Sequence, residues 1–195
     1  MNKTLTYYNE NASKFVATTV DVNFTEMQDK FLAQLEQGAS ILDFGCGSGR
    51  DSKYFIDKGY EVEAIDGSEE LCKIASEYAG IEVKHMLFDQ LEEVNKYDGI
   101  WACSSILHVP YGELPIILKK IAEALKEDGL VYTSFKHGTF EGERNGRYFT
   151  DLNEDKLAEL LVSAGVLEIK EQWITSDVRP GRDEEKWLNV ILKKI

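Results

Sequence analysis

The stretch Ile41-Leu42-Asp43-Phe44-Gly45-Cys46-Gly47-Ser48-Gly49-Arg50 decides the fold of this chain of 195 residues. Its apolar residues predict a buried strand, and three glycines at alternate positions predict a sharp turn into a helix over 51–58. Asp66 closes the next apolar run, and in a strand–helix–strand unit a carboxylate at that place meets the two hydroxyls of a ribose. The stretch therefore predicts a nucleotide-like ligand at the ends of two parallel strands.

Apolar periodicity continues this alternation of strand and helix along the chain. We expect strands over 62–66, 81–86, 97–102 and 130–135, and helices over 8–19, 24–35, 68–79, 114–125 and 157–164. The last two strands, 166–175 and 186–192, have no helix between them, so they should form an antiparallel hairpin. The prediction is an α/β, Rossmann-like fold whose seven-stranded, mostly parallel sheet has helices on both faces. Residues 38–195 would form this core, preceded by two helices within residues 1–37.

The glycine spacing separates two classes of nucleotide-binding protein. A dinucleotide fold has G-x-G-x-x-G, whereas this chain has G-x-G-x-G followed by Arg50. Asp43, two residues before the first glycine, is also foreign to the dinucleotide pattern. These features resemble motif I of the class I S-adenosylmethionine (SAM)-dependent methyltransferases. A glycine turn without a ligand is the alternative. It is disfavoured because strand, glycine turn, helix, strand and the acid at position 66 follow one another in the expected order.

The resemblance implies SAM as cofactor and S-adenosylhomocysteine (SAH) as product. In the family, motif I lies against the methionine part of SAM, an acid after the second strand binds the ribose, and residues after the third strand hold the adenine. Carried over by position, the implied cofactor-binding residues are Asp43, Gly45, Cys46, Gly47, Gly49, Asp66, Gly67, Ser68, Leu87 and Phe88. The resemblance also implies that the helices within residues 1–37 form a cap over the cofactor. We also expect Arg50 to bind the cofactor carboxylate, Tyr8 to cover the cofactor, and Cys103 to line the methyl-transfer site.

Two further segments bear on the type of methyltransferase. The string G-C-G-S-G-R-D and the segment Tyr7-Tyr8-x-x-x-Ala-x-x-Phe are similar to those of the tellurite-resistance-type bacterial small-molecule methyltransferases. Cys103-Ser104-Ser105-Ile106 stands where amino methyltransferases of bases and glutamine carry Asn-Pro-Pro-Tyr. We therefore expect a small-molecule acceptor rather than a nucleobase or protein glutamine.

The positions of the arginines indicate the charge of the methyl acceptor. Four of the five follow late strands of the sheet, at the edge where open α/β sheets bind ligands, namely Arg144, Arg147, Arg179 and Arg182. The planar guanidinium suits bidentate capture of a phosphate, carboxylate or other oxyanion, so these residues predict an anionic acceptor. Surface ion pairs with nearby acids such as Glu143 and Asp183 are the alternative interpretation.

Two histidines are candidate general bases, because imidazole titrates near neutral pH. His108 lies after the fourth strand and is the first candidate, and His137 after the fifth is the second. Each also has a structural interpretation, and an acceptor that is already an anion needs no base.

Composition excludes several classes of function. A formal net charge of −13 disfavours partners such as nucleic acid or anionic membrane surfaces. Three scattered cysteines and no leading apolar segment predict a cytoplasmic protein without a metal site. A SAM-dependent methyltransferase is the leading hypothesis, and a NAD-dependent oxidoreductase and a non-catalytic SAM-binding regulator are the alternatives. The sequence does not indicate the oligomeric state.

Overall fold

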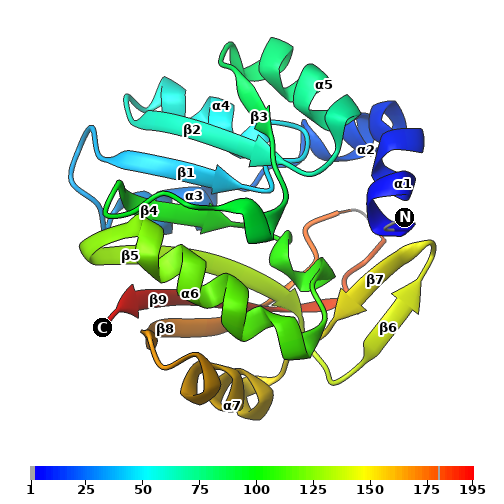
Figure 1. Ribbon diagram of the computed structural model, residues 1–195. Coiled ribbons are helices and arrows are strands. Elements are labelled where there is room, and N and C mark those ends of the chain that lie inside the picture. The colour runs from blue at the N-terminus through cyan, green and yellow to red at the C-terminus, as the bar shows by residue number, and fades with distance from the viewer. Residues whose placement is uncertain (1–2, 180) are drawn as a thin grey trace.

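Strand β1 (Ser40–Phe44) lies inside a seven-stranded sheet and carries the glycine-rich turn at its carboxyl end (Figure 1). This computed structural model describes residues 3–179 and 181–195. The strand order is β3-β2-β1-β4-β5-β9-β8. The other bounds are β2 Glu61–Asp66, β3 Val83–His85, β4 Tyr97–Ala102, β5 Leu125–Lys136, β8 Leu167–Ser176 and β9 Lys186–Lys194. The chain order reverses between β1 and β4, and open α/β sheets bind their ligands at such a point.

The strand directions agree with the prediction from the segments that connect the strands. The five strands from β3 to β5 in the sheet pair in parallel, whereas β9 is antiparallel to both β5 and β8. The mostly parallel, seven-stranded sheet with a terminal antiparallel hairpin is therefore confirmed.

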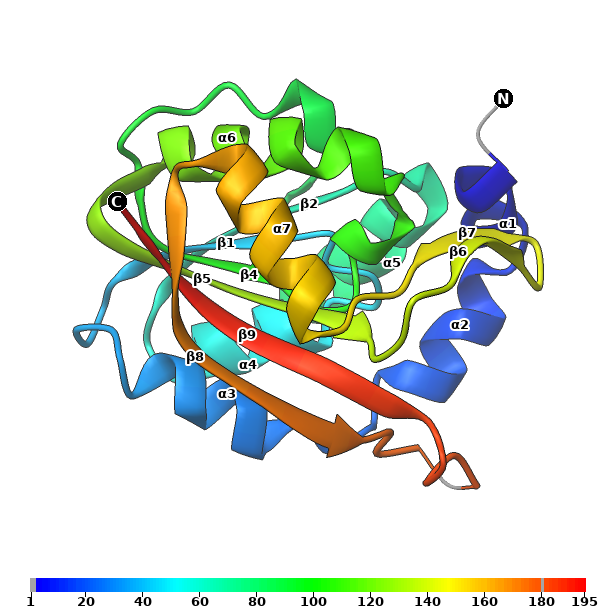
Figure 2. The same cartoon turned by 90° about the horizontal axis from the view of Figure 1, so that it is seen from below.

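Helices cover both faces of the sheet (Figure 2). Helices α3 (Thr25–Leu32) and α4 (Arg50–Asp57) lie on one face, and α6 (Leu114–Ala124) and α7 (Glu154–Ala164) on the other. Helix α5 (Glu69–Ala79) packs closely against the start of α4, since a Cβ on Gly49 would stand 3.1 Å from Ala75. The apolar stripes of these helices bury the sheet and hold the strand ends in fixed positions.

The N-terminal segment differs in detail from the prediction of one helix over 8–19. It forms α1 (Lys3–Glu10) and α2 (Ala12–Thr19), which meet at Asn11. The Asn11 side chain donates to the carbonyl of Tyr7 at 2.9 Å, and such side-chain bonds compete with the helical pattern. Figure 1 shows both helices at the edge of the sheet toward which β1 and β2 point.

A second hairpin was not predicted. Strands β6 (Glu141–Arg144) and β7 (Arg147–Thr150) are joined by a two-residue turn with φ of 50° and 79°, the signs that a type I′ turn requires. Three short 3-10 helices, Phe88–Gln90, Ile106–His108 and Tyr111–Glu113, follow β3 and β4. Strand β3 is shorter than predicted, and β5 begins at Leu125 rather than at residue 130. No helix within residues 3–179 and 181–195 is long and apolar enough to cross a membrane.

Candidate active site

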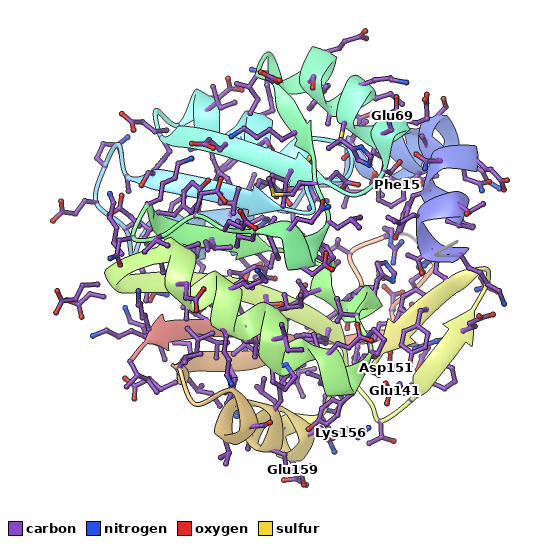
Figure 3. The ribbon with its side chains drawn as sticks, in the orientation of Figure 1. Phe15, Glu69, Glu141, Asp151, Lys156 and Glu159 are labelled. Carbon is purple, nitrogen blue, oxygen red and sulfur yellow. The ribbon has the colours of Figure 1, made fainter. Side chains whose placement is uncertain are left out.

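A cavity of about 410 Å³ lies between the carboxyl ends of the parallel strands and the helices α1 and α2. Its wall includes the turn after β1, the ends of β2 and β4, the hairpin β6–β7 and the loop between β8 and β9. Phe15 contributes from the side of α2 that faces this edge (Figure 3). The volume is typical of a small-molecule site, and its position is the switch point of the sheet.

Bare backbone forms the wall at the glycine-rich turn. The N–H groups of Gly45 and Cys46 both donate to the carbonyl of Ile65 at 3.0 Å, which ties the turn to β2. Gly45 has φ of 88°, and a Cβ there would stand 2.5 Å from Cβ of Ser105. Gly47 has φ of 56° and lies under the ring of Phe15. The sequence pattern therefore places main chain where a side chain would fill the space.

Asp66 projects its carboxylate from the end of β2 into the cavity wall. Oδ2 accepts the N–H of Gly47 at 2.9 Å, and Oδ1 accepts the N–H of Ser68 at 2.8 Å. Burial raises the pKa of Asp66, and these two donors oppose that effect. The carboxylate is thus held in one orientation, and each oxygen keeps a further lone pair for a ligand hydroxyl.

A second buried carboxylate fixes Arg50. Asp51 accepts Nε and Nη2 of Arg50 at 2.8 and 2.9 Å, and also Nε1 of Trp101 at 2.9 Å and the Gln28 amide at 2.7 Å. Burial alone would raise the pKa of Asp51, but the Arg50 charge and these donors hold it below its usual value. The guanidinium lies 4.7 Å from the centre of the Phe24 ring. Arg50 is therefore a preoriented cation in the cavity wall.

Tyr8 and His108 meet across the cavity. His108 Nδ1 lies 2.6 Å from the backbone carbonyl of Tyr148, which only accepts, so Nδ1 carries the proton. The hydroxyl of Tyr8 then donates to Nε2 at 2.9 Å, and Arg147 Nη1 donates to the same hydroxyl oxygen at 3.3 Å. Burial, together with the Arg147 charge, lowers the pKa of His108 to about 4, against the pull of the carbonyl. His108 is a neutral imidazole whose acceptor nitrogen is occupied.

Most of the residues singled out from the sequence come together in this cavity. Those lining it are Tyr8, Gly45, Cys46, Gly47, Arg50, Asp66, Gly67, Leu87, Phe88, Cys103, His108, Arg147, Arg179 and Arg182. Asp43, Gly49, Ser68, His137 and Arg144 are not in its wall.

The residues outside the wall have structural partners. Asp43 accepts the hydroxyl of Ser52 at 2.5 Å, and Ser68 caps α5 by accepting the N–H of Leu71 at 3.2 Å. His137 pairs with Glu154 at 3.0 Å, and Arg144 pairs with Asp151 beside the hairpin.

Several lining residues were missed. Ser134, Asp177, Trp187 and Asn189 face the part of the cavity beyond Cys103 and Ser104. A signal existed for two of them, because Ser134 and Asn189 are polar positions within the buried, mostly apolar segments 130–135 and 188–192 of β5 and β9. Ser104, which follows β4 beside Cys103, also lines the cavity, and its φ of 52° is rare for a residue other than glycine, a kind of backbone strain that gathers at functional sites.

The fold is that of a Rossmann-like protein whose cavity lies at the switch point of the sheet. The family model described as "Methyltransferase domain" matches residues 10–172, so the chain belongs to this methyltransferase family. With the motif described above, it contains a class I SAM-dependent methyltransferase domain.

Relatives and solved structures agree with that membership. The chain is 28% identical to (S)-coclaurine N-methyltransferase of Papaver somniferum over its whole length, and it spans 60% of that enzyme. Its fold is similar to that of the 1,6-didemethyltoxoflavin-N1-methyltransferase of Burkholderia thailandensis, a structure with bound 1,6-didemethyltoxoflavin and SAH (TM-score 0.76, 22% identity, 97% of this chain and 84% of that one). A TehB-like SAM-dependent methyltransferase from Corynebacterium glutamicum has a TM-score of 0.70 at 20% identity, with 98% of both chains covered.

Proposed function

We propose that this methyltransferase modifies a small acceptor that carries an anionic group, and that Arg147 binds this group. The observation that carries the proposal is the difference between Arg147 and the other arginines. Arg50, Arg144 and Arg179 each bind a buried carboxylate, and Arg182 lies 3.6 Å from Glu185. Within the described residues, no carboxylate lies within ion-pair distance of Arg147.

Arg147 is nevertheless held firmly in the cavity wall. Its guanidinium lies 4.7 Å from the ring centre of Tyr7, 5.7 Å from that of Tyr8 and 5.1 Å from that of Phe149. Its Nε is buried without a hydrogen-bond partner in the described structure. A half-buried cation with an unused donor favours an anion, and the fork of a guanidinium suits a carboxylate or another oxyanion.

The cofactor would occupy the other half of the cavity. We propose that Asp66 binds the ribose, that the backbone at Gly45 to Gly47 lies against the methionine part, and that Leu87 and Phe88 enclose the adenine. Arg50 would bind the cofactor carboxylate, and helices α1 and α2 would act as its lid. Because its three cysteines are free thiols, we also propose that the enzyme is cytoplasmic.

A matched pair of acceptors tests the anion site. 4-Mercaptobenzoate and 4-mercaptobenzamide differ in charge and carry the same nucleophile. Arg147→Gln should raise KM for the carboxylate about 10-fold or more and leave KM for the amide within about twofold, because a charge-assisted contact contributes about 1.5–3 kcal/mol. Arg144→Lys on the same hairpin is the control and should change neither. Equal effects of Arg147→Gln on both acceptors would contradict the proposal.

A further inference from the structure

The acceptor side of the cavity has no available general base among the described residues. Its carboxylate, Asp177, accepts Nε of Arg179 at 2.8 Å and the indole N–H of Trp187 at 3.1 Å. Although burial opposes it, the pairing with Arg179 holds the pKa of Asp177 at about 2. A carboxylate this strongly paired is a poor proton acceptor. The other lining acids are Asp51, which is paired with Arg50, Asp66, which ends β2, and Asp89 and Glu113, which are exposed to solvent on the segments after β3 and β4.

His108 is not available either. Its Nδ1 proton is committed to the Tyr148 carbonyl, and its Nε2 lone pair is taken by the Tyr8 hydroxyl. Arg147 adds a positive charge that disfavours a second proton on the ring. Tyr8 in turn receives a hydrogen bond from Arg147, so the three groups form one chain of donors that ends on a carbonyl.

The remaining groups on this side are neutral donors or cations. Burial raises the pKa of the Cys103 thiol to about 12. Ser104 donates its N–H to the Ser134 hydroxyl at 2.9 Å, and the two hydroxyls lie 3.2 Å apart. Lys136 forms an ion pair with Glu185. Hydroxyls of this kind can donate to an anion, but at neutral pH they do not remove a proton from a nucleophile.

We propose that the methyl-accepting atom enters this site already ionised, as a thiolate or another chalcogen anion of a small acid, and that no residue of the protein removes its proton. The inference rests on the proposed function for the second, carboxylate-type group. In the step, a lone pair of the anion forms the new bond to the methyl carbon. The carbon–sulfur bond of SAM breaks and its electron pair stays on the sulfur of SAH. No proton moves, and a cation and an anion become two neutral groups, which a water-poor site favours.

The experiment compares nucleophiles instead of binding groups. 4-Mercaptobenzoate and 4-hydroxybenzoate carry the same carboxylate, but at about pH 8 the thiol is largely ionised and only about 1% of the phenol is. With SAM and the wild-type protein, we expect the thiol to react about 100-fold faster or more. The rate with the phenol should rise about tenfold per pH unit toward its own pKa near 10. The ratio of the two rates should be the same in His108→Gln as in wild type.

Three results would overturn the inference. One is turnover of the phenol that is independent of pH between about 6 and 8. Another is a ratio of the thiol rate to the phenol rate that rises in His108→Gln, since loss of a general base would slow only the reaction of the protonated acceptor. The last is absence of turnover with both thiols, the benzoate and the benzamide. The two proposals can fail separately. If Arg147→Gln does not change the reaction of 4-mercaptobenzoate, the anion site is contradicted, but the proposal of an ionised nucleophile still stands.

Discussion

The hydroxyl of Tyr8 donates to Nε2 of His108 at 2.9 Å, and this contact joins two residues that are 100 positions apart in the chain. It brings helix α1 against the segment after β4 and fixes the tautomer of the imidazole. Burial of the imidazole, together with the Arg147 charge, lowers the pKa of His108 to about 4, so this histidine is a weak base.

The His108 environment predicts a pH dependence of stability. Its pKa of about 4 in the folded protein lies below the value of about 6.5 expected in the unfolded chain, so the unfolded chain binds more protons between these values. Stability should therefore fall as pH drops through this window, by about 3 kcal/mol, and the loss should be complete below about pH 4. Urea unfolding of wild type and His108→Gln at each pH isolates this contribution. Parallel curves of unfolding free energy against pH for the two proteins would show that folding does not lower the pKa of His108.

Asp66 should control cofactor affinity. Asp66→Asn keeps the shape but replaces one acceptor oxygen by a donor, so the bond to Gly47 or Ser68 and the contact with ribose hydroxyls cannot both persist. We expect SAH to bind about 1–3 kcal/mol more weakly by calorimetry. Asp155→Asn, on the first turn of α7, is the control and should bind normally. Wild type should show no heat with NAD, and tight NAD binding would contradict the cofactor assignment.

Glycine 45 should tolerate no side chain. Gly45→Ala combines a φ of 88° with a Cβ only 2.5 Å from Ser105, whereas Gly80→Ala has a φ of 75° and nothing within 4 Å. The second variant measures the backbone strain alone, about 1–2 kcal/mol. Gly45→Ala should cost about 1–3 kcal/mol more in chemical unfolding, because the turn or Ser105 must move. Equal losses in the two variants would show that the turn has room to relax.

Asn9 should couple the lid to the cofactor site. Its side-chain oxygen accepts the Ser68 hydroxyl at 2.7 Å and the N–H of Glu70 at 3.2 Å, which ties α1 to the start of α5. We expect SAH to increase hydrogen-exchange protection across residues 3–20, and Asn9→Ala to reduce this increase. Asn11→Ala removes an amide that donates to Tyr7 within the N-terminal segment and serves as control. Unchanged protection of wild type on saturation with SAH would contradict a mobile lid.

The sequence predicted the parallel core because local and long-range signals agree there. The apolar run before Gly45, the glycine turn and the acid at Asp66 all require the same strand–helix–strand unit. The terminal hairpin followed from the absence of a helix between the last two strands.

The hairpin β6–β7 was missed although a signal was present. Asn145-Gly146 is a typical two-residue hairpin turn, but its flanking residues carry charges instead of the alternating apolar pattern of a strand. The sequence also placed Arg144 and Arg147 together in one anion site. The structure gives them different partners, because Arg144 reaches back to Asp151 while Arg147 lies over aromatic rings of α1. Such pairings depend on tertiary contacts that spacing alone does not determine.

The reversal of chain order at β1 and β4 has a consequence for how such enzymes diversify. Cofactor contacts would gather on the ends of β1, β2 and β3, and acceptor contacts on β5, β9, the hairpin and the loop between β8 and β9. If the hairpin β6–β7 and that loop were exchanged for those of a relative, the acceptor specificity should change while the cofactor-binding part of the cavity stays intact. Helix α1 reaches Ser68 on one side, and Thr4 accepts the N–H of Tyr148 on the other, so this helix would have to co-evolve with both.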